Sequence, residues 1–438
     1  MKKTIAVIGG GPAGMMAAYT AACTLRKAWI DDVDVLLYER NPMLGKKLRI
    51  TGKGRCNVTN NCTPAEFREA VTRNQKFLYG ASSRFTSADT MAFFESFGVP
   101  LKTERGRRVF PVSDKAADIA LAMERALADA GVRVYKGMRV SRIEMVPDAS
   151  SADSAAGNGE YCPVRILAGD RWVSCHALIV ATGGVSYPGT GSTGDGHRMF
   201  AELGIPVTEL KPSLVPVETK ENTAELMGLT LKNVTLSACR GEKKIFEEQG
   251  EMLFTHFGLT GPLVLSASAN MQKGSVTDYR LYIDLKPALT EEELDKRLLS
   301  DFAKYSARDF CNSLDDLLPK RLIPWVIRVS GIPERCKTAS ITKVQRQKLL
   351  TALKALPFTP TKFRPLDEAV VTCGGVEVSA VSPKDMMLKK YPGLFCAGEL
   401  LDLDAYTGGY NLQIAFSTGV LAGQGAVEFV TGNVTGKK

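Results

Sequence analysis

The stretch that decides the fold is TIAVIGGGPAG, residues 4–14. Its first half is a short β-branched apolar run that ends in glycine, and a small-residue helix is predicted from Ala13 to Leu25. A second apolar run, from Asp34 to Glu39, ends in an acid. A strand, a turn, a helix and a second strand within the first forty residues predict a βαβ unit, and therefore a parallel sheet.

The glycines of this turn follow a dinucleotide-binding pattern. Gly9-x-Gly11-x-x-Gly14 stands between the strand and the helix, and Glu39 closes the next strand. The first glycine permits a tight turn, the second lets the backbone approach a pyrophosphate, and the third lets helix and strand pack closely. Glu39 is expected to bind the adenosine ribose hydroxyls. An acid at this position disfavours a 2′-phosphate, so the expected ligand is FAD or NAD rather than NADP.

The loop that follows favours FAD. Residues 40–60 (RNPMLGKKLRITGKGRCNVTN) contain six basic residues, four glycines or prolines and no acid. Such a loop can cradle an extended dinucleotide through backbone amides and through Lys or Arg contacts. A solvated basic loop is the alternative interpretation of this segment taken alone.

The rest of the chain predicts a mixed architecture. Its 438 residues, 45% of them hydrophobic, suffice for roughly three average domains. Ser113 is expected to cap a helix that runs to Ala130, strands are expected over residues 131–135 and 177–184, and residues 149–159 are expected to form an exposed hairpin loop.

A different pattern fills the middle of the chain. Short alternating segments between about residues 205 and 287 predict an antiparallel sheet or small barrel. Thr290 to Glu293 has the form of a capping box, and a helical pattern continues to about residue 355. Strand patterns return over residues 368–378 and 393–398, and a last helix is expected from about Leu412 to Thr431.

We therefore predict an α/β fold, in which a Rossmann-like FAD-binding domain is formed by both chain ends. An antiparallel, barrel-like β domain and a helical subdomain interrupt it. The expected boundaries are residues 1–200 and 358–438 for the FAD-binding domain, 201–289 for the β insertion that covers the substrate, and 290–357 for the helical subdomain.

Four further blocks resemble a known family. They are GRRVFPVS (residues 106–113), ATGGVSYPGTGSTGDG (181–196), LFTHFGLTGP (253–262) and LFCAGELLDLDAYTGGYNLQIAFSTG (394–419). Together with residues 4–14 and 40–60 they resemble the signature of the BaiN and aminoacetone-oxidase group. This is a bacterial family of FAD-binding oxidoreductases among the glutathione-reductase-like flavoproteins. The likeness spans nearly the whole chain.

The resemblance implies a set of cofactor-binding residues. The ADP half of FAD would be held by Gly9, Gly11, Pro12, Ala13, Gly14, Glu39 and Arg40. The residues along the flavin and its pyrophosphate would be Lys46, Gly54, Arg55, Cys56 and Asn57. The adenine would meet the backbone of Val140, and the second glycine turn would be Thr182, Gly183 and Gly184. The ribityl chain and the pyrimidine edge of the flavin would contact Gly398, Glu399, Asn411, Leu412, Gln413 and Ala415. A helix that opens at Leu412 would point its N-terminus at the flavin carbonyl edge and stabilise negative charge on the reduced ring.

Two side chains are candidates for catalysis. His256 stands in a block flanked by glycine and proline, where it would act as a general acid or base or as a hydrogen-bond donor to a substrate carbonyl. A purely structural histidine is the alternative. Tyr406, in the glycine-rich loop, would supply a phenol. Cys56 has no CxxC partner, so we expect a neutral contact with the flavin rather than a redox dithiol.

A second GxGxxG pattern, Gly189-x-Gly191-x-x-Gly194, has weaker support as an NAD site. The preceding strand is expected to end near Thr182, too early for the tight turn, and no acid closes a following strand. We expect a glycine-rich loop that passes close to the flavin.

These features predict an FAD-dependent oxidoreductase with NADH or NADPH as a transient electron donor. The resemblance implies reduction of an activated C=C bond, as in an enone of the bile-acid or steroid type, with hydride from flavin N5. It equally implies oxidation of a small amine such as aminoacetone as the alternative. An RNA-modifying flavoprotein is a further alternative, because residues 335–364 carry eight basic residues and no acid and would form the docking surface. The last alternative is a flavin-binding regulator without enzymatic activity.

Composition argues against several other classes. Ten cysteines without a CxxC pair, and only three histidines, predict no zinc or iron–sulfur site. No apolar run approaches the roughly 18 residues of a membrane span, and the start Met1-Lys2-Lys3 leads into glycines rather than into a signal peptide, so we expect a cytoplasmic protein. The expected partner is a small-molecule substrate, nucleic acid is less favoured, and the oligomeric state stays open.

Overall fold

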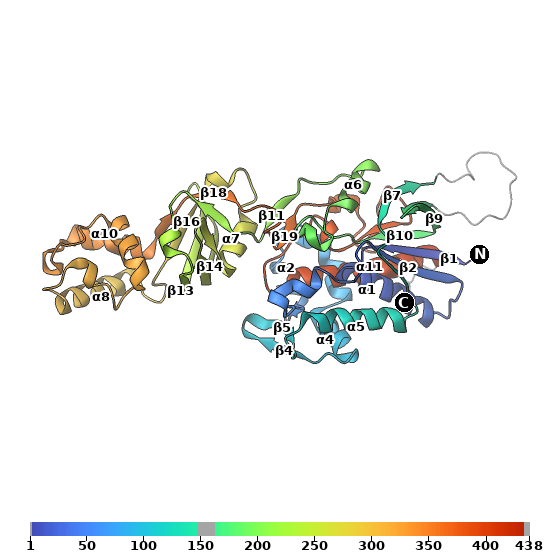
Figure 1. The fold of residues 1–438 in the computed structure, drawn as a ribbon, viewed down its shortest axis with the longest axis horizontal. Helices are drawn as coiled ribbons and strands as arrows, with labels where there is room; N and C mark the ends of the chain where they lie inside the picture. The colour runs from blue at the N-terminus through green and yellow to red at the C-terminus, as the bar shows by residue number, and fades with distance from the viewer. Residues whose placement is uncertain (1, 147–162, 433–438) are drawn as a thin grey trace. The chain divides into compact units, whose positions relative to one another are not determined.

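The computed structural model describes residues 2–146 and 163–432, which form two compact units. Unit 1 combines the N-terminal part of the chain, up to Pro212, with the C-terminal part from Val370, and unit 2 is the segment Ser213–Ala369 between them (Figure 1). The predicted loop at residues 149–159 lies outside the described residues. The finer division into three domains stays a prediction.

A five-stranded parallel sheet forms the centre of unit 1, in the order β20-β10-β1-β2-β6. Its strands are β1 (Lys3–Ile8), β2 (Val33–Glu39), β6 (Arg133–Lys136), β10 (Ala177–Val180) and β20 (Leu394–Cys396). The strand that comes last in the sequence pairs with β10, with Leu394 opposite Leu178. The α/β fold class and the parallel sheet are confirmed, and both chain ends contribute to one sheet.

Helices cover this sheet. The longer ones are α1 (Pro12–Lys27), α4 (Ser87–Ser96), α5 (Ala116–Asp129), α6 (Asp195–Glu202) and α11 (Tyr410–Thr431), and two single-turn helices are α2 (Pro64–Glu69) and α3 (Tyr79–Arg84). The two helices α1 and α11 pack against each other at very short range. A Cβ placed on Gly419 or Gly423 would lie 2.4 Å from the carbonyl oxygen of Ala13 or Ala17, so only glycine allows this approach.

Three smaller sheets complete the strands of the N- and C-terminal parts. The first is β3 (Thr59–Asn60), β5 (Arg108–Pro111) and β4 (Leu101–Glu104), and the second is β7 (Val140–Met145), β8 (Val164–Ala168) and β9 (Arg171–Cys175). Both are antiparallel. The third pairs β11 (Lys211–Ser213) with β19 (Val371–Cys373).

Unit 2 is built on a seven-stranded antiparallel sheet in the order β17-β16-β13-β14-β15-β12-β18. Its strands are β12 (Val217–Thr219), β13 (Thr230–Arg240), β14 (Lys243–Phe254), β15 (Gly258–Thr260), β16 (Tyr279–Asp284), β17 (Leu356–Phe358) and β18 (Pro360–Phe363). Its helices are α7 (Pro262–Asn270), α8 (Glu291–Lys304), α9 (Ile323–Ser330) and α10 (Lys343–Lys354). The predicted capping box of α8 is confirmed, with Thr290 and Glu293 bonded reciprocally. One hydrophobic core joins sheet and helices.

Three local predictions are wrong. Ser113 does not cap α5, because its hydroxyl bonds to Asp118 and the helix begins at Ala116. The strand expected over residues 368–378 is only Val371–Cys373, since the chain turns at Gly374 with a φ of 91°. The last helix begins at Tyr410 rather than Leu412, because Gly409 has the left-handed φ of 97° that starts it earlier.

The described residues contain neither a membrane-spanning helix nor a metal-binding cluster. Across residues 2–146 and 163–432, no helix combines the length and the apolarity that a bilayer span requires. Within the same ranges, no three His, Cys, Asp or Glu side chains are grouped so that they could hold a metal ion.

Candidate functional site

The first glycine turn lies at the carboxyl edge of the parallel sheet, between β1 and α1. A Cβ on Gly9 would lie 2.4 Å from the carbonyl oxygen of Ala181, and one on Gly14 would lie 1.9 Å from that of Gly9. A Cβ on Gly11 would meet nothing within 4 Å. Gly9 and Gly14 are therefore required by the packing of the chain itself, whereas Gly11 borders open space.

The N-terminus of α1 faces this open space without a cap. Gly11 is its N-cap residue, Pro12 occupies the first turn, and no side chain bonds to the N–H groups of that turn. Uncapped N–H groups and the helix dipole make such a terminus a binding site for phosphate. Pro12, Ala13 and Gly14 thus lie where the pyrophosphate of a dinucleotide would bind.

Glu39 lies beside the glycine turn, at the end of β2. Its buried carboxylate accepts a 2.6 Å hydrogen bond from the N–H of Gly10 through Oε2, and bonds of 2.7 Å from the backbone and side chain of Asn41 through Oε1. The acid is held in one orientation by these three bonds. Oε2 keeps acceptor capacity for a ribose hydroxyl, since a carboxylate oxygen can accept two bonds.

Arg40 points to the second glycine-rich loop instead. Its guanidinium donates to Thr193 at 2.6 Å and to Asp195 at 3.2 Å, and Asn41 donates to the carbonyl of Thr190. The loop at residues 189–194 therefore packs beside the end of β2. No strand leads directly into it, since β10 ends at Val180.

Asp195 is the centre of an arginine cluster. It accepts hydrogen bonds from Arg40, Arg139 and Arg198 at distances of 2.9 to 3.4 Å. Burial raises the pKa of Asp195, but the bonds and charges of these arginines outweigh it and hold the pKa below its usual range. The cluster joins α6 to the segment before Val140, a buried residue that begins β7.

Two predicted cofactor residues carry buried polar atoms without a hydrogen-bond partner. Among the described residues, Asn57 Oδ1 and Thr182 Oγ1 bond to no other group. Buried polar atoms are normally paired, so each unpaired one calls for an explanation. Both atoms belong to the set that the resemblance places along FAD, and a bound dinucleotide would supply partners. These residues therefore fit the cofactor.

Cys56 is buried in a tight turn that follows the kinked 3-10 segment η1 (Leu48–Gly54). Burial raises the pKa of its thiol to about 12, so the group is protonated at neutral pH and is no thiolate nucleophile. The side chain of the neighbouring Arg55 is held by other protein groups. It donates to Glu104 and Asp114, and its guanidinium lies over the ring of Phe110.

A lysine outside the predicted set reaches the sheet edge. Lys47 bonds to Glu399 at 2.9 Å and to Ser186 at 2.7 Å, whereas the Lys46 side chain has no hydrogen bond or ion pair among the described residues. Burial raises the pKa of Glu399, but Lys47 outweighs it through its charge and hydrogen bond, so the carboxylate stays ionised. Two adjacent lysines give no sequence signal that tells which one turns inward.

The last motif block comes close to the first glycine turn. Gly398 approaches α1 so closely that a Cβ on it would lie 2.7 Å from the Cβ of Ala13 and 3.9 Å from that of Ala415. At the start of α11, Gly409 is the N-cap and no side chain caps the helix. The Asn411 amide bonds to both backbone groups of Ala405 and closes the preceding loop. Leu412 lies in the first turn of the same helix.

The side chain of Gln413 forms its hydrogen bonds within the protein interior. Its amide oxygen accepts from the hydroxyls of Thr59 and Thr90, and its amide nitrogen donates to the carbonyl of Phe85 and to Ser417. These four bonds use both acceptor and both donor positions of the side chain. Its contribution to the site is the position of α11, which it ties to β3 and α4.

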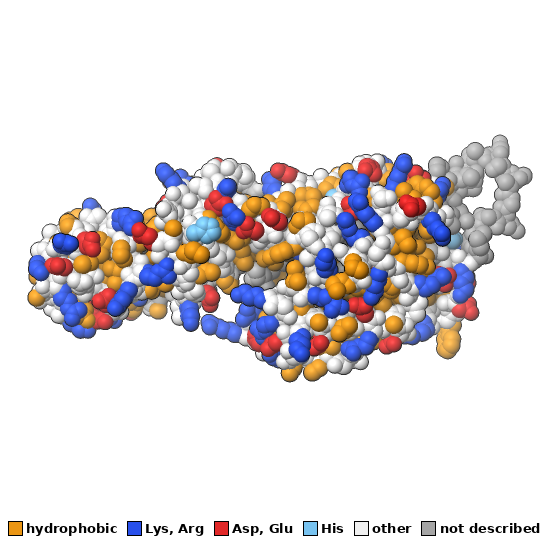
Figure 2. Space-filling model, viewed as in Figure 1, with side chains coloured by type: hydrophobic (Ala, Val, Ile, Leu, Met, Phe, Trp, Pro, Cys, Tyr) orange, Lys and Arg blue, Asp and Glu red, His pale blue; other side chains and the backbone are white. Residues whose placement is uncertain are grey.

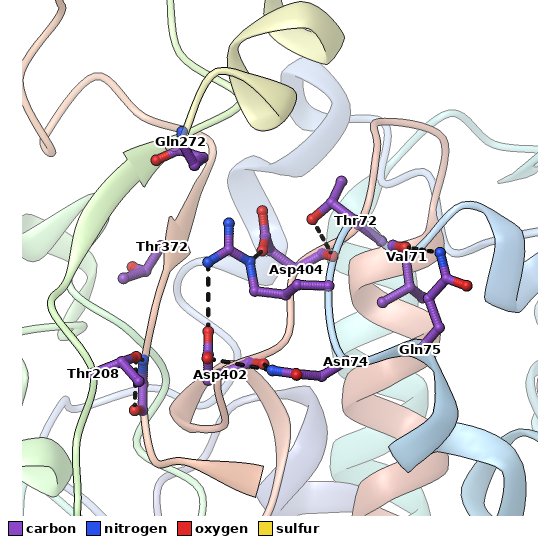
Figure 3. A network of polar contacts seen from close by, with 12 residues as sticks. Val71, Thr72, Asn74, Gln75, Thr208, Gln272, Thr372, Asp402 and Asp404 are labelled. Carbon is purple, nitrogen blue, oxygen red and sulfur yellow. Dashed lines mark hydrogen bonds and ion pairs between the residues drawn. The ribbon is translucent and has the colours of Figure 1, made fainter. Parts of the chain in front are cut away.

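An ion-paired network that the motifs did not reveal holds the loop before α11 (Figure 3). Arg73 Nε lies 2.6 Å from the fully buried carboxylate of Asp404 and its Nη1 lies 3.6 Å from Asp402. Thr72 donates twice to the carbonyl of Asp404, and the N–H of Tyr406 donates to Ala70. The half-buried Tyr406 is thus fixed through its backbone.

His256 belongs to unit 2, where it is exposed between β14 and β15. Its ring packs edge-on against Phe257, and the guanidinium of Arg364 lies over that phenylalanine. The catalytic roles of His256 and Tyr406 stay predictions.

The basic run at residues 335–364 is largely neutralised. Five of its eight cations pair with acids from elsewhere in unit 2: Lys337 with Asp309, Arg346 with Asp295, Lys354 with Asp284, and Lys362 and Arg364 with Glu218. Figure 2 shows basic and acidic side chains interspersed over this part of the surface. Neutralisation weakens the case for an RNA-docking surface.

A parallel sheet with a GxGxxG turn between β1 and α1 and an acid at the end of β2 is typical of a Rossmann-type dinucleotide-binding domain. The chain belongs to the family of the HI0933-like protein Rossmann domain, whose profile matches residues 3–425. It is an FAD-dependent oxidoreductase.

Two curated relatives match over nearly their whole length. The chain is 29% identical over 426 residues to a 3-dehydro-bile acid delta(4,6)-reductase of Clostridium scindens, a match that covers 97% of this chain and 99% of the relative. It is 31% identical over 418 residues to a ribosomal RNA dihydrouridine synthase of Haemophilus influenzae. This match covers 94% of this chain and 95% of the relative.

A solved structure shares the fold. It is the 3-ketosteroid-delta4-(5alpha)-dehydrogenase from Rhodococcus jostii in complex with 4-androstene-3,17-dione, with a TM-score of 0.51 and 15% identity over 97% of each chain.

Proposed function

We propose that this flavoenzyme reduces a C=C bond conjugated to a carbonyl group. The names of the two curated relatives support this chemistry. A delta(4,6)-unsaturated 3-dehydro steroid is a conjugated ketone, and dihydrouridine is uridine with the C5=C6 bond, conjugated to the C4 carbonyl, reduced. In both reactions hydride would add to the electron-poor carbon of the conjugated C=C bond and a proton to its other carbon.

The observation that supports the cofactor part of the proposal is that α1 and α11 both begin at a glycine N-cap with no side-chain hydrogen bond to it. The N-terminus of α1 would bind the pyrophosphate, and the N-terminus of α11 would stabilise negative charge near the site. Glu39 would hold the adenosine ribose. When bound, FAD supplies hydride at its N5 and regains it from NADH or NADPH.

The chain itself must supply the proton. Tyr406 and His256 are the proposed donors, because a phenol or an imidazolium can transfer a proton to carbon while a carbonyl is polarised. Tyr406 is held by the Asp404 loop, and His256 stands exposed on unit 2.

The preferred substrate is a small enone of the bile-acid or steroid type. The bile-acid reductase relative supports it, and the ion pairs of five of the eight cations in the basic run weaken the argument for an RNA-docking surface. A uracil base in ribosomal RNA is the second candidate, because two curated relatives at 31% and 28% identity are named for that reaction. Oxidation of a small amine has no support beyond the family resemblance.

An anaerobic half-reaction assay tests the proposal. The purified holoprotein is reduced with NADH or NADPH while flavin absorbance is followed, and the reduced enzyme is then mixed with a 3-keto-Δ4 steroid, a uridine-containing ribosomal RNA fragment or air. Rapid reoxidation by the steroid with formation of the saturated ketone is expected. Reoxidation by the RNA alone would move the assignment to the second candidate. Flavin reduction by aminoacetone, with reoxidation only by oxygen, would contradict both.

A further inference from the structure

An ion pair at the carboxyl edge of the unit 1 sheet joins four segments that are far apart in the sequence. Lys47 comes from the loop after β2, Ser186 from the loop after β10, Thr372 from β19, and Glu399 from the single-turn helix η12 (Gly398–Leu400) that follows β20. The side chains of Lys47 and Glu399 are 22% and 21% exposed. Their burial removes water that would otherwise solvate both charges.

The carboxylate of Glu399 lies directly against the second glycine turn. A Cβ on Gly184 would lie 3.0 Å from Glu399 Oε1, and one on Gly183 would lie 4.0 Å from Oε2. At Gly184 a side chain would meet the acid, and also Thr372 Oγ1 at 2.2 Å, whereas the distance at Gly183 is an ordinary van der Waals contact. The turn that the resemblance places at the cofactor and the Lys47–Glu399 pair therefore form one structure.

The two carboxylate oxygens of Glu399 accept different numbers of hydrogen bonds. Oε1 accepts from Thr372 N at 2.9 Å, from Ser186 Oγ at 3.1 Å and from Lys47 Nζ at 3.2 Å. Within residues 2–146 and 163–432, Oε2 accepts from Lys47 alone, at 2.9 Å. Since an ionised carboxylate oxygen accepts two bonds, Oε2 is the atom that retains capacity for a hydroxyl donor.

We propose that Lys47 is a positioning residue for FAD, which holds the Glu399 carboxylate against the second glycine turn so that Oε2 accepts a hydroxyl of the cofactor. Lys47 acts through Glu399 and needs no contact of its own with the flavin. The proposal concerns cofactor binding and does not depend on which substrate the enzyme reduces.

If Lys47 keeps Glu399 ionised, its removal should make FAD binding depend on pH. Loss of a lysine with a merely structural role would not do this. The titratable groups that face Glu399 among the described residues are Lys47 and, on α6, His197. Burial lowers the pKa of His197, so this ring is neutral at pH 7. Without Lys47, burial would raise the pKa of Glu399 with less to oppose it, and the carboxyl would take up a proton as the pH falls.

The experiment measures the dissociation constant of FAD from the full-length apoprotein between pH 6 and 9, by FAD fluorescence. The variants are Lys47→Met, Lys47→Arg, Glu399→Gln and the double variant Lys47→Met/Glu399→Gln. The control is Lys244→Met, which breaks an exposed lysine–glutamate pair with Glu247 in unit 2.

Lys47→Met is expected to weaken FAD binding about 30- to 100-fold at pH 7 and further toward pH 6, where wild type stays level. Lys47→Arg should remain within about fivefold of wild type, since it keeps the charge. The double variant should bind FAD no more weakly than Glu399→Gln alone, and without pH dependence, because both charges are gone. The control should match wild type.

Three results would overturn the proposal. One is a Lys47→Met dissociation constant within threefold of wild type at every pH. Another is a double variant whose loss equals the product of the two single losses, since Lys47 would then act independently of Glu399. The third is a wild-type apoprotein that takes up no FAD, which would remove the cofactor assignment as well. If Lys47→Met does not fold, the double variant replaces it, and a pH-dependent loss there contradicts the role assigned to Glu399.

Discussion

Arg73 Nε lies 2.6 Å from Oδ1 of Asp404, a carboxylate with no exposed surface, although the two residues are separated by most of the chain. This contact joins the segment after α2 to the loop that carries Tyr406 and leads into α11 (Figure 3). Asn74 strengthens the link through two bonds to Asp402. The geometry of the loop therefore depends on an arginine outside every motif.

Arg73→Gln is expected to lower the free energy of unfolding by about 3 to 5 kcal/mol, because it removes a charged partner of the buried Asp404 carboxylate. Denaturant unfolding monitored by circular dichroism measures this. The double variant Arg73→Gln/Asp404→Asn should recover part of the loss, and Lys304→Gln, which breaks an exposed pair with Asp316, should leave the midpoint unchanged. Equal stability of Arg73→Gln and wild type would show that the pair is dispensable.

Gly11 and Gly14 should respond in opposite ways to alanine. Gly14→Ala places a methyl group 1.9 Å from the Gly9 carbonyl, so it should destabilise the apoprotein by about 2 kcal/mol or more and lower its melting temperature by about 4 °C or more. Gly11→Ala meets nothing within 4 Å and has an ordinary φ of −82°, so the apoprotein should fold normally. FAD titration of Gly11→Ala should nevertheless show at least tenfold weaker binding. Unchanged FAD affinity would mean that this space is not reserved for the pyrophosphate.

Cys56 should be inert to thiol reagents. Because burial raises its pKa to about 12, the thiol is protonated throughout the range from pH 6 to 9 and is shielded from solvent. Iodoacetamide labelling of the native protein, read by mass spectrometry, should modify the partly exposed Cys239 and leave Cys56 unmodified until the protein is unfolded. Rapid native labelling of Cys56 would contradict its burial.

Asp195 should contribute stability only where it is ionised. Its folded-state pKa lies below the ordinary value of about 3.9, so its contribution is fully present above about pH 5 and is lost as the pH falls through the folded-state pKa. Asp195→Asn should destabilise the protein by about 2 kcal/mol at pH 7. The difference from wild type, measured by urea unfolding at several pH values, should shrink below pH 4. A difference that stays constant down to pH 3 would exclude a role for the charge.

The proton donor can be separated from hydride supply by half-reactions. If Tyr406 donates the proton, Tyr406→Phe should slow reoxidation by an enone about 100-fold and leave flavin reduction by NADPH or NADH unchanged. The same experiment on His256→Ala decides between the two candidates. Stopped-flow absorbance of the flavin measures both phases. A variant that slows both phases equally would have lost cofactor placement rather than a proton donor.

The sequence by itself determined the features whose physics is local. The turn from Gly9 to Gly14 follows from the positive φ and close approach that only glycine permits, and the start of α8 follows from the reciprocal bonds of Thr290 and Glu293. The parallel sheet followed from a helix between two consecutive strands, which is the crossover that parallel neighbours require. These signals act over a few residues, so they can be read without knowledge of the rest of the chain.

Only the tertiary structure decided which polar side chains bind other groups of the protein and which remain available to a ligand. It turned Lys47 rather than Lys46 toward Glu399, enclosed Gln413 in four hydrogen bonds, and paired most of the basic run with acids. The partners in these contacts lie far apart in the sequence, and a buried charge or amide is stable only when packing brings it a partner. No pattern within a few residues records that choice.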